Sequence, residues 1–354
     1  MLKNGEISID EANALLEELE KVQTEKTRKE DYLLYEATPV FQEESTESKR
    51  DAKSFLKVAT DKISSLFDTA AKKLKELDLD FYHSVTFEHV FQTNETDFTD
   101  IVIDLAFGST TIHVWDVDEV RAECRVKVYR TEEVEEGKKK FLASVTFGKE
   151  GHTFSFESRD KFTKVDAHLY VPRNKYEDLY VKLLNGSIEA EGLQAEKWHC
   201  RTINGKIRLA DCQGDEGELE TGNGIVIGSN NTFRKLEVDT VNGKINVDGS
   251  YQKMELKTIT GTIHTTIKNK DADTIQIDSG TAAIYVTIPE EVPVYGELKA
   301  NLGAFNVELD DVHIINSLQE PVQKKMKFER GIDGSEQPLF LYVESKTGAI
   351  FIKG

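Results

Sequence analysis

One short phrase recurs five times in this chain, and its spacing constrains the fold more than any other feature. Each copy joins an anchor glycine to an apolar run, as in LLNGSIEAEG from residue 183 and TVNGKINVDG from residue 240. Steps of 19, 19, 19 and 18 residues separate the successive anchor glycines, which are Gly186, Gly205, Gly224, Gly243 and Gly261. A repeat this regular indicates structural units that stack on one another.

Side chains around each anchor glycine alternate between apolar and polar types. The apolar rows include Ile188, Ile207, Val226, Ile245 and Ile263, two residues after each glycine, and Val181, Cys200, Leu219, Val238 and Leu256, five residues before it. The polar rows are Lys182, Arg201, Glu220, Asp239 and Lys257, together with Tyr180, His199, Glu218, Glu237 and Glu255. Alternation with a period of two, repeated in every unit, predicts a mainly β fold: a single-stranded β-solenoid with coils of about 19 residues.

An asparagine precedes each of the first four anchor glycines. These are Asn185, Asn204, Asn223 and Asn242. Both residue types tolerate the positive φ of a sharp bend, so the pair predicts the corner of each coil. Equivalent asparagines at the same height predict a ladder of side-chain amide hydrogen bonds along the stack.

The sequence before the repeats divides into four regions. Residues 1–35 predict a helical module, with Ser8 as the N-cap of a helix over residues 5–22, and the short lead before this cap suggests that the module is incomplete. Residues 36–50 have linker composition, residues 51–79 predict a basic amphipathic helix, and residues 80–354 predict the solenoid. Within the last region, the run KKFLASVTFGKEGHTFSFES predicts two strands around Gly148 and Gly151.

The helix over residues 51–79 combines an apolar face with positive charge. Between Lys49 and Glu76 there are eight basic and four acidic residues. Such a helix could cover an open end of the solenoid, or it could contact an anionic membrane or a partner. The candidate contact residues are Phe55, Val58, Lys62, Ile63, Leu66, Phe67, Lys72, Lys73 and Leu74.

Composition excludes several classes of function. The formal net charge of −19 disfavours nucleic acid as a partner. No apolar run approaches the ~20 residues that span a bilayer, and no secretory signal is visible. We therefore expect a protein that is cytoplasmic or is peripherally associated with the membrane or the cell surface. The three cysteines and the scattered histidines show no spacing typical of a metal site, and we expect neither a metal nor a cofactor.

One acidic cluster could be interpreted as catalytic. It comprises Asp211, Asp215, Glu216, Glu218 and Glu220, with Arg201 and Arg208 nearby. Paired carboxylates are typical of glycosidases, but Arg201 and Glu220 share a register in adjacent coils, which predicts a cross-strand ion pair instead. Trp115 is the only aromatic residue expected to face outward as a sugar platform. We therefore predict that the protein is not an enzyme.

The repeat, the entry VPRNKYEDLYVKLLNGSI, the strand DVDEVRAECRVKVYR and the helix GEISIDEANALLEELE resemble the bacterial "putative adhesin" family of β-strand-repeat proteins, and within it the YvlB-like and LiaX-like members. The resemblance implies a right-handed β-solenoid with a small helical N-terminal module. It also implies a role in the cell-envelope stress response, because LiaX-like members are linked to sensing cationic antimicrobial peptides. It supplies no catalytic residues.

These observations together predict a non-enzymatic binding or sensing protein of the bacterial envelope. The acidic surface would attract cationic peptides, and an envelope-stress regulatory membrane protein is a further expected partner. Two alternatives stay open: a solenoid that binds or cleaves carbohydrate, and a cytoplasmic scaffold that recruits a partner through its N-terminal helices.

Overall fold

The computed structural model describes residues 83–320, 323–331 and 337–354. The chain divides into two units, Met1–Lys57 and Val58–Gly354, and all described residues belong to the second. Before the regular repeats the elements are β1 Ser84–Thr93, β2 Asp100–Phe107, β3 Thr110–Trp115, β4 Val120–Tyr129, α3 Val134–Ser144, β5 Val145–Glu150, β6 Thr153–Ser158 and β7 Thr163–Pro172.

The repeats and the C-terminal part contain strands only. The repeats form β8 Lys175–Asn185, β9 Ile188–Glu191, β10 Gln194–Asn204, β11 Ile207–Ala210, β12 Gln213–Asn223, β13 Val226–Asn242, β14 Ile245–Thr260 and β15 Ile263–Ile267. The C-terminal part forms β16 Thr274–Ser279, β17 Ile284–Thr287, β18 Val294–Ala300, β19 Phe305–Glu308, β20 Val312–Glu320, β21 Gln323–Arg330, β22 Leu339–Ser345 and β23 Ile350–Lys353.

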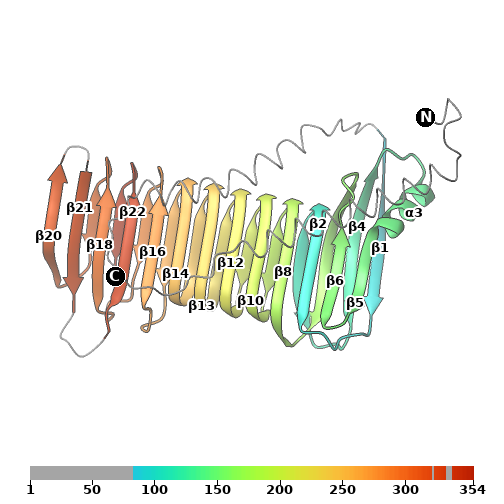
Figure 1. Ribbon diagram of the computed structural model, residues 1–354, viewed down its shortest axis with the longest axis horizontal. Coiled ribbons are helices and arrows are strands. Elements are labelled where there is room, and N and C mark those ends of the chain that lie inside the picture. The colour runs from blue at the N-terminus through green and yellow to red at the C-terminus, as the bar shows by residue number, and fades with distance from the viewer. Residues whose placement is uncertain (1–82, 321–322, 332–336) are drawn as a thin grey trace, which may run out of the picture. The chain divides into compact units, whose positions relative to one another are not determined.

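The repeats wind into coils, each with one long and one short strand segment (Figure 1). The long segments β8, β10, β12, the second halves of β13 and β14, and β16 pair in parallel and form what we call the long face. The short segments β9, β11, the first halves of β13 and β14, β15 and β17 pair in the same way and form the short face. The predicted β-solenoid is confirmed, while the handedness of its winding stays a prediction.

The register between coils follows the spacing of the sequence repeat. Arg201 pairs with Glu220, Glu220 with Asp239, and Asp239 with Lys257. The apolar rows face the core, and their members two and five residues from the anchor glycines are all at most 1% exposed. The alternating pattern therefore predicts the core of the repeats correctly.

Glycine is required at the corners mainly because neighbouring coils approach closely there, and less because of its backbone φ angle. Gly205, Gly224 and Gly243 do not have positive φ, whereas Gly186 and Gly261 have φ values of 151° and 145°. A Cβ atom on any of the five would overlap the backbone carbonyl of the glycine in the preceding coil. The expectation that φ explains the repeated glycine is therefore wrong for three of the five.

The order of the coils departs from the order of the chain at both ends. β2 lies between β6 and β8, and β3 lies between β7 and β9. At the other end β22 lies between β16 and β18, and β23 lies between β17 and β19. The first and last coils of the sequence are thus each held on two sides, which the repeat spacing does not reveal.

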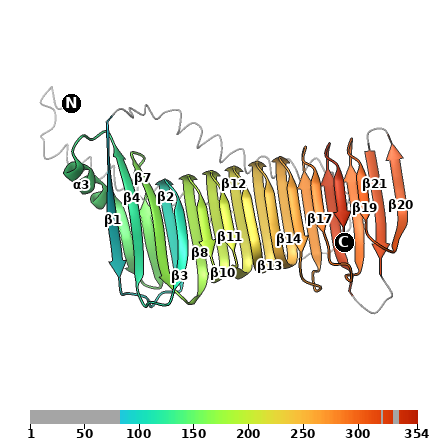
Figure 2. The same cartoon turned by 180° about the vertical axis from the view of Figure 1, so that it is seen from behind.

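A short helix packs at the end of the stack that contains β1 (Figure 2). Phe141 of α3 is fully buried, and its ring centroid lies 6.0 Å from that of Phe87 and 5.8 Å from that of Phe91 on β1. Gly137 lies so close to β1 that a Cβ atom would meet the Val85 side chain. The prediction of strand for the residues before Val145 is wrong, since Lys139–Ser144 belong to α3.

The predicted helical module, the linker and the amphipathic helix over residues 51–79 lie outside the described residues. Their proposed roles as a cap, a membrane contact or a partner site stay predictions. Among the described residues, no helix combines the length and the apolar character needed to cross a bilayer.

Candidate functional site: the carboxylate patch of the long face

Five carboxylates gather on the outer surface of three neighbouring strands of the long face. Glu218 on β12 lies in register with Glu237 on β13, which lies in register with Glu255 on β14. Two residues further along the strands, Glu220 on β12 and Asp239 on β13 form a second row beside the first. All five side chains are half-buried, and we call them the carboxylate patch.

The row of three glutamates is electrostatically costly. Like charges directly opposite one another in a sheet are destabilising, and adjacent strands lie only ~4.8 Å apart. Basic neighbours relieve part of this cost: Lys235 Nζ lies 2.6 Å from the Glu237 carboxylate, and Lys257 pairs with Glu255. Because each cation sits at the margin of the rows, the centre of the patch stays rich in negative charge.

Two carboxylates of the patch, Glu218 and Glu220, contact the basic side chains of His199 and Arg201 on β10. His199 Nδ1 lies 3.0 Å from the Glu218 carboxylate, and this hydrogen bond lowers the pKa of Glu218 to about 2 and raises that of His199. Burial raises the pKa of Glu220 to about 7, although its partner Arg201 acts in the opposite direction. Burial thus disfavours the ionised form of Glu220, while the ion pair with Arg201 favours it.

Asp239 completes the patch and lies in register with Lys257 on β14. Burial raises its pKa to about 6, and the neighbouring charges of Glu255 and Glu237 add to this effect, while Lys257 opposes it. Burial also raises the pKa of Asp178 on β8 and of Asp278 on β16, which flank the patch on the same face. Burial is the main cause of these raised pKa values, and at Asp239 the carboxylates of Glu255 and Glu237 add a negative potential that a bound cation would offset.

The acidic cluster considered for catalysis is divided by the structure. Arg234 binds Asp215 and Glu216 through three hydrogen bonds of 2.6 to 3.0 Å, and the Asn230 amide donates to Asp211 over 2.6 Å. Arg208 lies on β11 of the short face, whereas Glu218 and Glu220 lie on the long face. The predicted ion pair between Arg201 and Glu220 is confirmed.

The Asn-Gly corners form a hydrogen-bonded ladder. The Asn223 side-chain amide donates from Nδ2 to Oδ1 of Asn204 over 2.8 Å, and the Asn242 side-chain amide donates from Nδ2 to Oδ1 of Asn223 over 3.0 Å. Asn185 lies in register with Asn204 at the start of the ladder. The corner residues thus have a structural role, and the candidate membrane residues from Phe55 to Leu74 lie outside the described part of the chain.

Aromatic side chains stack on one another at two places on the described faces, one of which joins Tyr170 to His113 and Trp115. The rings of His264, Tyr285 and Phe351 stack along the short face at centroid distances of 4.5 and 4.7 Å, with interplanar angles of 5° and 4°. The two faces of the Tyr285 ring are therefore covered by His264 and Phe351. Trp115 is half-buried and donates its Nε1–H to the Glu119 backbone carbonyl over 2.8 Å. The expectation that Trp115 is the only outward aromatic residue is wrong, since Tyr285 is 36% exposed.

The cysteines and the histidines are the remaining candidate reactive groups. All three cysteines are free and buried. His113 and His168 approach to 3.2 Å between ring nitrogens, a pairing that sequence spacing cannot show because β3 and β7 lie 55 residues apart at this point. No group of three potential metal ligands occurs among the residues that the structure describes.

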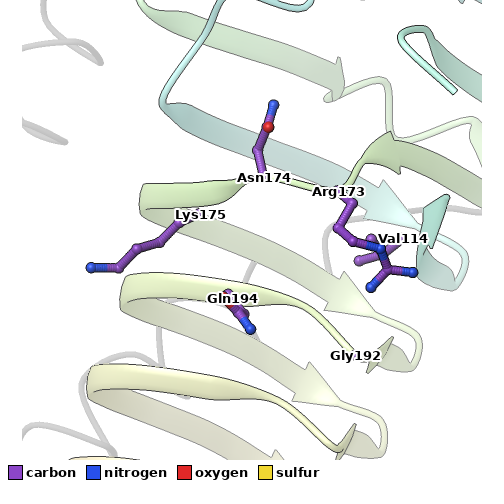
Figure 3. A pocket seen from close by; sticks show the side chains of 6 residues that line it. All are labelled: Val114, Arg173, Asn174, Lys175, Gly192 and Gln194. Atoms are coloured by element: carbon purple, nitrogen blue, oxygen red, sulfur yellow. The ribbon is translucent and has the colours of Figure 1, made fainter. Parts of the chain in front are cut away.

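A shallow pocket of about 300 Å³ lies at a corner near β7 and β8. It is lined by Val114, Arg173, Asn174, Lys175, Gly192 and Gln194 (Figure 3). The Arg173 and Lys175 side chains point in different directions, and each is already paired at 2.8 Å, with Asp116 and Glu196 respectively. The pocket therefore offers no strong site for an anion.

Comparison with known proteins identifies the family of this chain. YvlB from Bacillus subtilis (strain 168) is 30% identical over 355 residues, covering 100% of this chain and 96% of that protein. A solved "putative adhesin" from Bacteroides fragilis NCTC 9343 is 8% identical, covers 75% of this chain and 97% of its own, and gives a TM-score of 0.41.

A solved "putative lipid binding protein" from Parabacteroides distasonis ATCC 8503 is 9% identical, covers 75% of this chain and 97% of its own, and gives a TM-score of 0.38. Likeness at this level carries no argument about ligands. The family profile described as Toastrack DUF4097 matches residues 98–326, which is more than half of the chain. The chain therefore belongs to the Toastrack DUF4097 family.

Proposed function

We propose that the protein is a non-enzymatic binding protein that recognises cationic segments of peptides through the carboxylate patch. The observation that carries this proposal is the pair of rows on β12, β13 and β14, in which Glu220 and Asp239 have raised pKa values because burial and like charges disfavour ionisation. The charge of a bound cation favours the ionised form of these carboxyls, so cation binding is linked to the release of protons from them.

The shape of the site suits an extended or surface-bound partner. The long face is a continuous parallel sheet whose outward side chains are half-buried. Ammonium groups spaced along a peptide could each meet a carboxylate, since carboxylates recur at the ~4.8 Å spacing of strands and the ~7 Å spacing of alternate residues. The net charge of −19 would attract such peptides at long range.

The wider role that we propose is a response to envelope stress or to cationic antimicrobial peptides at the bacterial envelope. The support is the combination of the patch, the acidic balance of the chain and the sequence resemblance to LiaX-like proteins. A site in the cytoplasm or at the membrane periphery, and a regulatory membrane protein as partner, are parts of the same proposal.

The test is fluorescence anisotropy with a labelled octalysine peptide. The double variant Glu237→Gln/Asp239→Asn removes two charges from the patch and should weaken binding about tenfold, as expected for two ion pairs of up to ~1 kcal/mol each. The control Glu88→Gln/Glu95→Gln removes two exposed carboxylates near the other end of the stack and should leave binding close to that of the natural chain.

The pH and salt dependences provide a second readout. Binding should tighten as the pH rises from 5 to 8, because Glu220 and Asp239 gain negative charge in this window. It should weaken with added salt, because salt screens attraction between charges. Equal affinities for both double variants, or binding that is insensitive to salt, would contradict the proposal.

A further inference from the structure

The end of the stack formed by β20 exposes unusual apolar surface. β20 is the outermost strand at this end in both views (Figures 1 and 2), where it pairs with β21. Ile314 and Ile315 are 58% and 51% exposed, and Leu318 is 41% exposed. Leu302, at the corner after β18, is 64% exposed. The three most exposed large apolar side chains of the described residues, Leu302, Ile314 and Ile315, thus lie at this end, together with Leu318.

The opposite end is partly covered, although Val90, Val134 and Leu142 there are 48%, 42% and 47% exposed. There α3 packs on β1 and buries Phe141 completely. A solenoid coil cannot bury its own apolar row, so each end requires a cover or a partner. Within the described part of the chain, β20 pairs with β21 alone and has no strand on its other edge. Its outer backbone groups are therefore available for a further strand.

The sequence of β20 lacks the usual protection of an edge strand. Natural edges are commonly guarded by lysine, proline or inward-pointing charge. β20 reads VHIINSLQE and holds a single formal charge, Glu320. This local neutrality matters because two chains of net charge −19 would otherwise repel one another on approach.

We infer that β20 pairs antiparallel with β20 of a second copy of this chain, which joins two solenoids end to end. The irregularity between Ile314 and Asn316 leaves Asn316–Glu320 as the regular stretch, and a two-fold axis at its centre sets Leu318 against the Leu318 of the second copy. Glu320 then faces Asn316 of the second copy. Within each copy, Asn316 pairs with Lys327 on β21. This register pairs Leu318 with Leu318, places Lys327 one strand beyond the Asn316 that Glu320 faces, and sets no like charges face to face between residues 316 and 320.

Sedimentation velocity of the full chain over a concentration series tests the inference. The natural chain should form a dimer at micromolar concentration. Leu318→Lys sets two ammonium groups opposite each other and should weaken the dimer at least about tenfold. Ile225→Lys is the matched control, because Ile225 is 42% exposed at a corner beside the middle coils and should leave the dimer intact.

Cross-linking gives the register directly. Leu318→Cys places two thiols across the two-fold axis, within the Cα separation of 4.4–6.8 Å that a disulfide requires. The three native cysteines are buried and should contribute no background. Rapid disulfide formation by Leu318→Cys, and none by Ile225→Cys, is expected.

Two results would overturn the inference. One is a natural chain that sediments as a monomer at high micromolar concentration, as it would if residues 1–82 or another protein cover this end. The other is a dimer that Leu318→Lys leaves unchanged, which would place the interface elsewhere.

Discussion

Replacing Gly243 by alanine tests why glycine recurs at the corners. Gly243 does not have positive φ, so the substitution adds no conformational strain of its own. The new Cβ atom would instead overlap the carbonyl group of Gly224 in the preceding coil and would press on the Thr240 hydroxyl. The perturbation is therefore a pure test of the close approach between coils.

The magnitude follows from what must move. Overpacking an interior costs about 1–3 kcal/mol, and we expect about 3 kcal/mol here because the overlapping atoms are backbone atoms of a paired coil. Loss of glycine also reduces the entropy of the unfolded chain, which offsets about 0.4–1 kcal/mol of this cost. With a shift of about 2–4 °C per kcal/mol for a domain of this size, the net loss lowers Tm by about 4–10 °C.

Gly192→Ala is the matched comparison. Gly192 has φ of 67°, and a Cβ atom there would have nothing within 4 Å, so its cost comes from φ alone and should be about 1 kcal/mol. Thermal unfolding followed by circular dichroism compares the two variants. A Gly243→Ala variant as stable as Gly192→Ala would refute the account of the corners.

Three further predictions follow from single side chains. Hydrogen bonds from Lys325, Lys299 and Lys327 outweigh the effect of burial and lower the pKa of Glu297 to about 2, so Glu297→Gln should cost about 1–2 kcal/mol at pH 7. Because the stabilising charge is lost as the pH falls from 4.5 towards 2, urea unfolding should show this difference vanishing over that window. Asn223→Ala removes a donor and an acceptor from the amide ladder and should destabilise the fold by about 1 kcal/mol, more than Asn185→Ala at the start of the ladder; equal urea midpoints would contradict this. The three cysteines should react with a thiol reagent only after unfolding, since burial raises their pKa values, and fast reaction of the folded chain would count against their burial.

The regular coils could be predicted from the sequence because two signals coincide there. The alternation within each strand and the spacing of the anchor glycines both report the same geometry, so the inward rows and the register follow from counting. The outward rows of the long face were also recognised as charged. Burial and neighbouring residues such as Arg201 and Lys257 decide which of these charged side chains form a patch. The spacing of the repeat predicts neither the burial nor the neighbours.

The order of the terminal coils could not be predicted. Parallel pairing depends on the alternation of side chains and on strand length. By both criteria β18 would fit beside β16 as well as β22 does, although β22 is the strand that lies there. The sequence of β22 therefore carries no local sign of its place. Chain connectivity suggests the wrong neighbour.

Helix α3 was missed for a different reason. Gly137 weakens the helical pattern of VEEGKKKFLAS, and the short segment precedes a clear strand. The structure shows that Gly137 is needed because the helix lies against Val85 of β1. Tertiary packing thus overrides local propensity at this site.

Disulfide formation between paired cysteines on the long face tests the central claim most directly, namely that coils stack in register and out of chain order. Asp278 on β16 lies in register with Glu344 on β22, and Glu344 lies in register with Lys299 on β18. The double variant Asp278→Cys/Glu344→Cys should cross-link readily, since adjacent strands lie ~4.8 Å apart. Asp278→Cys/Lys299→Cys should not, because ~9.6 Å separates strands that are two apart. Stacking in chain order would give the opposite result, with the second pair linked and the first pair free.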